Sequence, residues 1–126
     1  KINNVASNYF SDLTFSKKLN VIVDKLVNYE EHILNMPPPL ALKIDVQGYE
    51  YNVLKGISET QFKSIKWIYL ELSDFEMYCG QKTRKDIHEF LLGKGYLLSK
   101  TANKYFNEYN DLIYCDCLYT RTSSLL

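Results

Sequence analysis

Hydrophobic and polar residues follow one another along the chain in blocks that predict strands separated by helices. Residues 40–46 form a short, nearly continuous apolar run with Asp45 near its end, which is the pattern of a strand covered on both faces. Residues 67–72 have the same character, and residues 96–100 and 111–119 predict two further strands on either side of a polar, hairpin-like loop. Alternation of strands with helices indicates an α/β sheet.

Helix signals lie between these strands. Residues 51–55 predict a short helix that a glycine stops, and Ser58 and Gln61 have the spacing of a capping box for another. Thr83 is a good N-cap for a longer helix, which ends near the Gly-Lys-Gly sequence at residues 93–95.

The first third of the chain is less regular. Residues 1–16 are polar and weakly periodic, so we predict a loop there, with room for a short edge strand. After them two patterns compete, because apolar residues recur at helical spacing while residues 21–23 are β-branched and suit a strand. We predict a strand that ends at Val23, then a helix over residues 28–34, then an extended link through the three prolines at 37–39.

The last two predicted strands are joined without a helix, which indicates an antiparallel pair at one edge of the sheet. We therefore predict a mostly parallel sheet with an antiparallel closing strand. With 126 residues, the chain is long enough for one compact domain and too short for two.

Charge and composition exclude several classes of function. Lys and Arg number 15, as do Asp and Glu, so no basic excess exists to neutralise phosphates and we predict no nucleic-acid partner. No apolar run approaches the ~20 residues of a membrane-spanning helix.

Cys79, Cys115 and Cys117 form neither a disulfide framework nor a zinc pattern, and the last two lie two apart in a strand and so point to one face. Buried, reduced thiols fit a reducing compartment, which predicts a cytoplasmic protein.

The most informative stretch is Lys-Ile-Asp-Val-Gln-Gly-Tyr-Glu at residues 43–50. Ligands of open α/β sheets bind outside the carboxyl ends of the strands, where Asp45 lies directly before a glycine turn. A carboxylate at the end of an apolar strand needs a partner. Asp45 or Glu50 could instead accept hydrogen bonds from the free N–H groups of the next helix, and the sequence leaves both interpretations open.

Glu71 lies near the end of the next predicted strand, at a position where packing would call for an apolar residue. Parallel strands separated by one helix are usually neighbours, so Asp45 and Glu71 should project into one crevice. Two carboxylates that close share a proton or bind a cation. The alternatives are a salt bridge to Lys43 or Lys66, or a position at the edge of the sheet.

These residues resemble a known family. Residues 42–56 resemble the signature of the FkbM family, roughly L-K-I-D-V-[EQ]-G-x-E-x-x-V-L-K-G, with unbroken spacing. Later segments resemble the family in their order: Ile-Tyr-Leu-Glu-Leu-Ser at 68–73, Tyr-Cys-Gly at 78–80, Gly-Tyr at 95–96 and Asp-Leu-Ile-Tyr at 111–114. The resemblance spans most of the chain from about residue 19.

The resemblance implies a Rossmann-like class I methyltransferase that moves a methyl group from S-adenosylmethionine to a hydroxyl oxygen of a small molecule or a sugar. It implies Asp45 and Glu71 as catalytic residues and, if Mg²⁺ is used, as its ligands. The residues expected to line the acceptor side are Gln47, Tyr49 and Glu50, and those expected to contact the cofactor are Asp45 and Val46.

One part of the family's pattern is missing from the sequence. The cofactor half of the family contributes a first strand, a Gly-rich turn and an acidic residue for the ribose, whereas no Gly-x-Gly turn follows a strand here. We therefore interpret residues 1–126 as a partial methyltransferase domain that lacks its cofactor-binding N-terminal half and is inactive alone. The alternative is a non-catalytic α/β remnant or a binding module.

Overall fold

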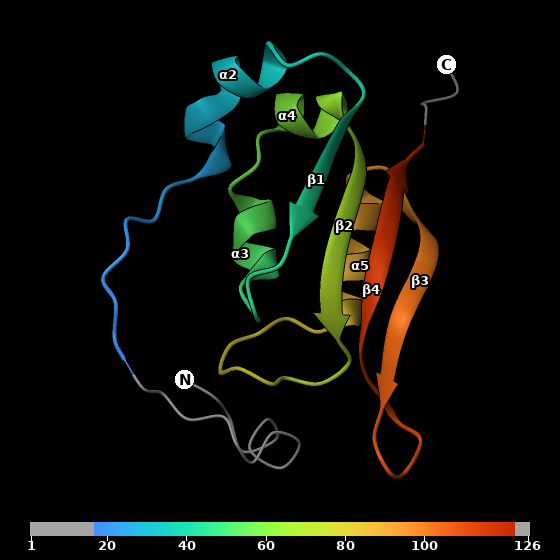
Figure 1. Cartoon of the computed structure of the whole chain (residues 1–126). Coiled ribbons are helices and arrows are strands. Elements are labelled where there is room, and N and C mark those ends of the chain that lie inside the picture. Colours follow the sequence, from blue (N-terminus) through green and yellow to red (C-terminus); the bar gives the residue numbers. More distant parts are fainter. Residues whose placement is uncertain (1–16, 123–126) are drawn as a thin grey trace.

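Helices and strands alternate along the chain in the computed structural model, which describes residues 17–122 (Figure 1). In chain order the elements are the 3-10 helix η1 (Leu26–Tyr29), α2 (Glu30–Leu34), β1 (Leu40–Ile44), α3 (Glu50–Lys55), α4 (Glu59–Ser64), β2 (Ile65–Ser73), α5 (Arg84–Gly93), β3 (Tyr96–Phe106) and β4 (Leu112–Arg121). The predicted α/β class is confirmed, and each strand predicted after the prolines is present.

The predicted strand that ended at Val23 is wrong. Residues 17–25 form no strand, and the side chain of Ile22 is fully exposed. A β-branched run becomes a strand only where a neighbour supplies hydrogen bonds and a covered face, and no strand within residues 17–122 pairs with it. The helix predicted over residues 28–34 is present as η1 followed by α2. The loop predicted over residues 1–16 lies outside the described residues.

The four strands have the order β1-β2-β4-β3. Only β1 and β2 are parallel, whereas β4 is antiparallel to both β2 and β3. The predicted antiparallel closing pair is therefore confirmed, but the prediction of a mostly parallel sheet is wrong for these residues. The hairpin between β3 and β4 was predicted. The difference arises because β4 lies between β2 and β3 and pairs antiparallel with β2 as well, which leaves β1–β2 as the parallel pair of the described residues.

One face of the sheet carries the core. Helices α3, α4 and α5 contribute Leu54, Phe62 and Leu91 to a single buried cluster with the strand residues Ile68 and Leu70. Alternate residues along each strand point to the other face, and there Ala41, Lys43 and Trp67 are exposed. The prediction that the strand over residues 40–46 is covered on both faces is wrong, because the helices that pack on the sheet in the described region share one side.

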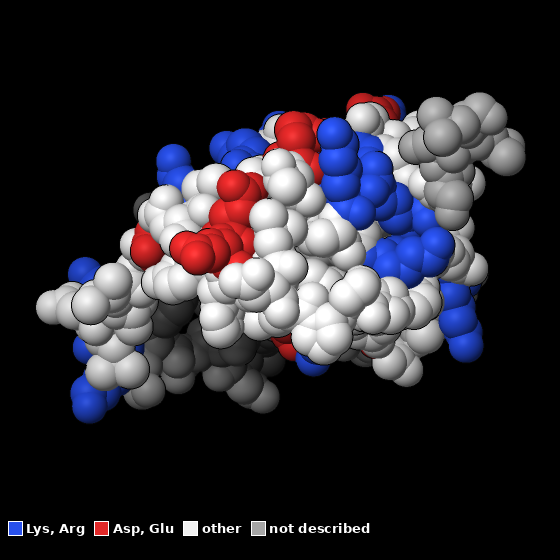
Figure 2. Space-filling view, turned by 90° about the horizontal axis from the view of Figure 1, so that it is seen from above, with Lys and Arg blue, Asp and Glu red and all other residues white. Residues whose placement is uncertain are grey.

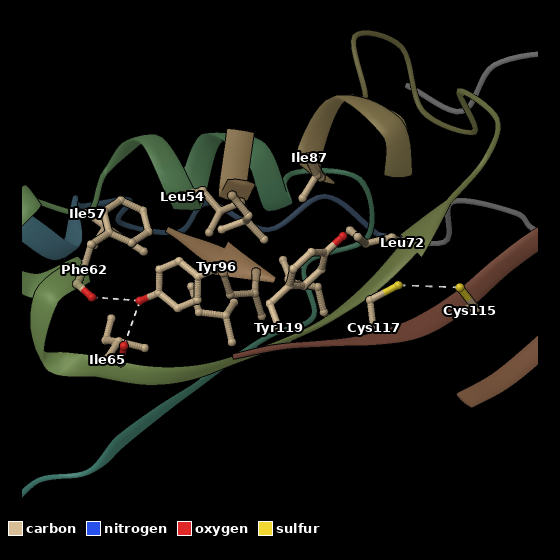
Figure 3. Packing of buried hydrophobic residues seen from close by; sticks show 14 residues of the cluster. Leu54, Ile57, Phe62, Ile65, Leu72, Ile87, Tyr96, Cys115, Cys117 and Tyr119 are labelled. Carbon is tan, nitrogen blue, oxygen red and sulfur yellow. Dashed lines mark hydrogen bonds between the residues drawn. The ribbon is translucent and has the colours of Figure 1, made fainter. Parts of the chain in front are cut away.

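The hydroxyl group of Tyr96 ties this core together at its centre (Figure 3). Tyr96 is fully buried, and its O–H donates to the carbonyl oxygens of Phe62 and Ile65, each at 2.8 Å. Burial raises the pKa of Tyr96 to about 12, so the group stays a neutral donor that fixes the end of α4 and the start of β2.

Both predicted helix caps are present. Ser58 accepts from the backbone N–H of Gln61 while the Gln61 amide oxygen accepts from the N–H of Ser58, and Thr83 exchanges the same pair of bonds with Asp86. Gln61 is fully buried, and its amide nitrogen also donates to the carbonyl of Leu26 at 2.7 Å. The cap of α4 thereby holds η1 against the helical layer.

Candidate functional site

The loop after β1 is held in place by the first residue of α3. Glu50 is 3% exposed, and its carboxylate accepts hydrogen bonds from the backbone N–H groups of Gly48 at 3.0 Å and Val46 at 3.4 Å. Gln47 and Gly48 both have left-handed backbone, with φ of 50° and 97°. Glycine adopts this conformation freely, but for Gln47 it costs on the order of 1 kcal/mol. The buried carboxylate therefore stabilises a loop that places a strained Gln47 beside the end of β1.

Gln47 joins the two carboxylates that the sequence singled out. Its amide nitrogen donates to Asp45 Oδ1 at 3.2 Å and to Glu71 Oε2 at 3.3 Å. A side-chain amide has two N–H hydrogens, so both bonds can form at once. Asp45 directly follows β1, and Glu71 lies on the parallel neighbour β2, so the pairing of these strands brings the two side chains together.

Glu71 lies among other acidic groups. Partial burial is the main cause that raises the pKa of Glu71 above its ordinary value, and the negative charge of Asp45 raises it further, while the hydrogen bond from Gln47 lowers it. Asp116 faces Glu71 directly across the β2–β4 pair and adds a smaller effect of the same sign. A carboxylate in this setting takes up a proton more readily than one in water, as a general base must.

Asp45 has the salt bridge considered above, but it is weak. Lys43 Nζ lies 3.6 Å from Asp45 Oδ2, and the two side chains are 68% and 47% exposed. Exposed pairs of this kind contribute little to stability, typically under ~1 kcal/mol. Lys66 contacts neither carboxylate and instead donates to the carbonyl of Arg121.

Tyr78 forms the opposite wall and was not singled out as a site residue from the sequence. Its hydroxyl donates to the amide oxygen of Gln47 at 3.3 Å, and its ring covers Gly48 so closely that a Cβ there would lie 2.6 Å from Tyr78 Cδ2. The absence of a side chain at Gly48 is therefore what lets the two loops meet. In the sequence, Tyr78 stood out only as part of the Tyr-Cys-Gly segment that resembles the family, and that segment does not indicate a contact with Gly48.

The loop that carries Tyr78, residues 74–83, is fixed at several points. The guanidinium group of Arg84 donates two hydrogen bonds to the carboxylate of Asp74, from Nε to Oδ1 at 2.5 Å and from Nη2 to Oδ2 at 2.8 Å. The amide oxygen of Gln81 accepts from the backbone N–H groups of Met77 at 3.0 Å and Tyr78 at 3.1 Å. Bidentate pairs of this kind are among the stronger polar contacts, so Tyr78 is presented by an ordered loop.

These groups enclose a cavity of about 240 Å³ at the carboxyl end of β2. Its lining residues are Gln47, Gly48, Glu50, Glu71, Leu72, Ser73, Met77, Tyr78, Gln81 and Tyr114. The cavity combines aromatic and apolar walls with acceptors and donors from Glu71 and the two glutamines. No Lys or Arg is among those residues, so the lining offers no cationic side chain to a negatively charged ligand.

The remaining predicted site residues lie around this cavity or beside it. Gln47 and Glu50 line it, whereas Val46 (40% exposed) and Tyr49 (56% exposed) line a second, open groove. That groove has a volume of about 860 Å³ and also includes Asp24, whose Oδ1 accepts from the backbone N–H of Lys25 at 2.8 Å. Hydrogen bonding to that backbone N–H, more than any other cause, lowers the pKa of Asp24, so its carboxylate is ionised at neutral pH.

A divalent cation does not fit between Asp45 and Glu71 in this arrangement. The N–H hydrogens of Gln47 point at both carboxylates, and they occupy the space that a cation would need. Within residues 17–122, no group of three or more His, Cys, Asp or Glu side chains could hold a metal ion. We therefore derive no step of the chemistry through Mg²⁺.

The described helices are all too short or too polar to cross a membrane.

No curated protein and no solved structure matches the chain. Among protein-family models, the methyltransferase FkbM domain matches residues 6–98, a span that includes both candidate carboxylates and the loop of Tyr78. This match covers well over half of the sequence. The chain therefore belongs to the FkbM methyltransferase family.

Proposed function

We propose that this chain carries the acceptor side of an S-adenosylmethionine-dependent methyltransferase that methylates a hydroxyl oxygen on a small molecule or a saccharide. One observation carries the proposal. Two carboxylates at the ends of adjacent parallel strands are held by one amide at 3.2 and 3.3 Å beside a cavity of about 240 Å³, in a chain of a methyltransferase family. Ligands of open α/β sheets bind at such strand ends.

The second groove is suited to part of the cofactor. Val46, Val53 and Tyr49 give it an apolar and aromatic wall, and Asp24 places an ionised carboxylate in it. Its volume of about 860 Å³ lies in the usual range for small-molecule sites, ~300–1,000 Å³. An aromatic face suits the adenine ring, and a carboxylate suits ribose hydroxyl groups. When bound, S-adenosylmethionine supplies a methyl group on a positively charged sulfur.

The chain's own residues would bind the acceptor and remove its proton. Glu71 lines the cavity, and a hydroxyl group placed there would donate to its carboxylate. S-adenosylmethionine would supply the methyl group with loss of its sulfur–methyl bond, and the proton of the acceptor O–H would pass to Glu71. Asp45, through Gln47, would keep Glu71 oriented and keep the site negative, which favours the proton's arrival. Tyr78 would close the cavity against water.

The test is turnover of the complete enzyme with Glu71→Gln and Asp45→Asn. Each change keeps the size of the side chain and removes its charge, so we expect the rate to fall at least about tenfold. Release of S-adenosylhomocysteine in the presence of monosaccharides and phenols gives the rate. Glu89→Gln on α5 is the matched control, because Glu89 is exposed and does not line the cavity. Wild-type turnover in both cavity variants would refute the proposed roles.

A second readout separates loss of chemistry from loss of fold. Calorimetric binding of S-adenosylhomocysteine to the complete enzyme should survive Glu71→Gln, because Glu71 does not line the proposed cofactor groove. Failure of the unmodified enzyme to bind S-adenosylmethionine would instead favour the non-catalytic binding module.

A further inference from the structure

A second polar site lies at the opposite end of the sheet, where β1 and β2 begin and β4 ends. A groove there is lined by residues of the Pro-Pro link, of α4, of β2 and of β4. Three of its side chains are cationic: Lys63 in the last turn of α4, Lys66 in β2 and Arg121 at the end of β4. Seen from this end of the molecule, Figure 2 shows a band of Lys and Arg side chains along one side.

The cations are uncompensated although the chain as a whole is neutral. The formal net charge of the full sequence is zero. Three positive charges gathered in one groove therefore mean that positive and negative side chains are unevenly distributed over the molecule. Within residues 17–122, none of the three takes part in an ion pair with a carboxylate. Like charges that gather without a counter-charge repel one another, and an anion in the groove would relieve that repulsion.

Two of the three cationic groups, those of Lys66 and Arg121, are held in place by bonds to the backbone. Arg121 Nη1 donates to the carbonyl of Lys63 at 2.8 Å, and Lys66 Nζ donates to the carbonyl of Arg121 at 3.3 Å. These bonds link α4, β2 and β4, so the charges come from three elements that the fold brings together. A site whose groups are positioned beforehand loses less entropy when a ligand binds.

Arg121 has a donor without a partner. Its Nε is the buried side-chain nitrogen or oxygen that lacks a hydrogen bond within the described part of the chain. Buried polar groups are nearly always paired, and an exception calls for a water molecule or an ion that satisfies it. The hydroxyl groups of the groove, Ser64 and Thr122, donate to the carbonyls of Gln61 and Gly95, and neither accepts from this Nε.

We propose that this groove binds a phosphate monoester group. Proteins bind phosphate mostly with arginine, through its planar guanidinium group, and with lysine, through its compact ammonium charge. A monoester carries nearly two negative charges at neutral pH and so balances three nearby cations better than a carboxylate does. The groove holds about 260 Å³, far more than the ~30 Å³ of one water, which leaves space for an organic group beside the phosphate.

The site is independent of the proposed methyl transfer, because it lies at the other end of the strands from Glu71. It can therefore be tested with the full chain whatever its activity. The probe is inorganic phosphate, titrated at constant ionic strength while amide resonances are followed by NMR. We expect saturable shifts centred on residues 63–66 and 121–122. Shifts that grow linearly, or that equal amounts of chloride reproduce, would overturn the proposal.

Two variants locate the site. Lys63→Gln and Lys66→Gln keep the backbone carbonyl groups and should leave the fold intact, and each should weaken phosphate binding by about three- to tenfold, the effect of one charge-assisted contact. Lys104→Gln, on the exposed part of β3, is the matched control and should bind as the unmodified chain does. Unchanged binding in both groove variants would refute the site even if phosphate binds elsewhere.

Two further experiments test the pH dependence of binding and the kind of molecule that carries the phosphate. Phosphate loses most of its second charge between about pH 7.5 and 5.5, whereas sulfate does not, so phosphate binding alone should weaken on acidification. Equal weakening of sulfate would point to a change in the protein and would count against the proposal. A soluble sugar phosphate and vesicles that contain phosphatidate then separate a free ligand from a lipid headgroup, and binding of either one that Lys63→Gln weakens supports the phosphate site.

Discussion

Gln47 uses each half of its amide group. The nitrogen donates to Asp45 and Glu71, and the oxygen accepts from the hydroxyl of Tyr78. A glutamate at this position would add another acidic group to a neighbourhood that already raises the pKa of Glu71. The neutral amide, which supplies donors to both carboxylates, is therefore well suited to keep the pair close together, and its hydrogen bond opposes the rise in the pKa of Glu71.

Substitution of Gln47 should change the titration of Glu71. The Gln47 hydrogen bond lowers the pKa of Glu71, so Gln47→Ala should raise that pKa, and Gln47→Glu should raise it more because a negative charge replaces a donor. NMR titration of the ¹³C-labelled side-chain carboxyl group measures it directly in this chain. Since a base works only when deprotonated, the rise of enzyme activity with pH should move to higher pH in the same order.

Gln81→Ala is the contrasting variant for this prediction. Gln81 also lines the cavity, but it holds backbone N–H groups of the Tyr78 loop and has no direct bond to either carboxylate. We expect it to disturb the loop with a smaller effect on Glu71. A pKa of Glu71 that is the same in Gln47→Glu as in the unmodified chain would show that Gln47 does not control the pair.

The candidate carboxylates could be chosen from the sequence because their signal was local. An acidic residue at the end of an apolar strand stands out in one dimension, and neighbouring strands bring two such residues together. Tyr78 could not be found in this way, since nothing in its own segment indicates that its ring will cover Gly48. Glu50 was predicted at the acceptor side, and although it lines the cavity, its carboxylate is engaged with the loop's own N–H groups.

At the scale of elements, the loops after β1 and β2 meet at Gly48. This glycine has two constraints at once, a φ of 97° and the ring of Tyr78 against it, whereas Gly80 has a φ of 83° and nothing within 4 Å of an added Cβ. The two glycines thus separate the cost of backbone conformation from the cost of the contact.

Gly80→Ala should destabilise the chain by about 1 kcal/mol, the cost of left-handed backbone for a residue with a Cβ. Gly48→Ala should cost a further ~1–3 kcal/mol, because the methyl group must displace Tyr78 from a packed position. Urea unfolding followed by fluorescence gives both values. Equal destabilisation by the two substitutions would mean that the contact between Tyr78 and the loop after β1 contributes nothing.

Elements defined by local chemistry were predicted best. The capping box at Ser58, the N-cap at Thr83 and the hairpin loop between the last two strands depend on residues a few positions apart, and all are present. The strand predicted to end at Val23 failed because its fate depends on a partner strand, which the segment itself cannot indicate. Whether two strands pair parallel or antiparallel likewise depends on where the chain places the later strand in the sheet. The sequence of a single strand does not indicate this, and the prediction of a mostly parallel sheet was therefore wrong.

At the scale of the whole molecule, the helices gather on one face of the sheet and enclose a core with two of the three thiols. Cys115 and Cys117 lie on β4, fully buried, with their sulfur atoms 3.6 Å apart (Figure 3). Both therefore point to the same face, as their spacing predicted. Burial is the main cause that raises the pKa of Cys117 to about 12, and the neighbouring Cys115 adds to it.

These thiols should report on unfolding of the entire core. The thiolate is the reactive form, so Cys117 at about pH 8 is both hidden and protonated, and Cys79 is the exposed thiol. A colorimetric disulfide reagent should label one thiol rapidly in the native chain and all three in denaturant. Cys79→Ser should abolish the rapid phase, and the slow labelling that remains should follow the opening of the sheet and its helical layer. Rapid labelling of two or more thiols in the native chain would mean that the face of β4 under α5 is open to solvent, and with it the core that supports both candidate sites.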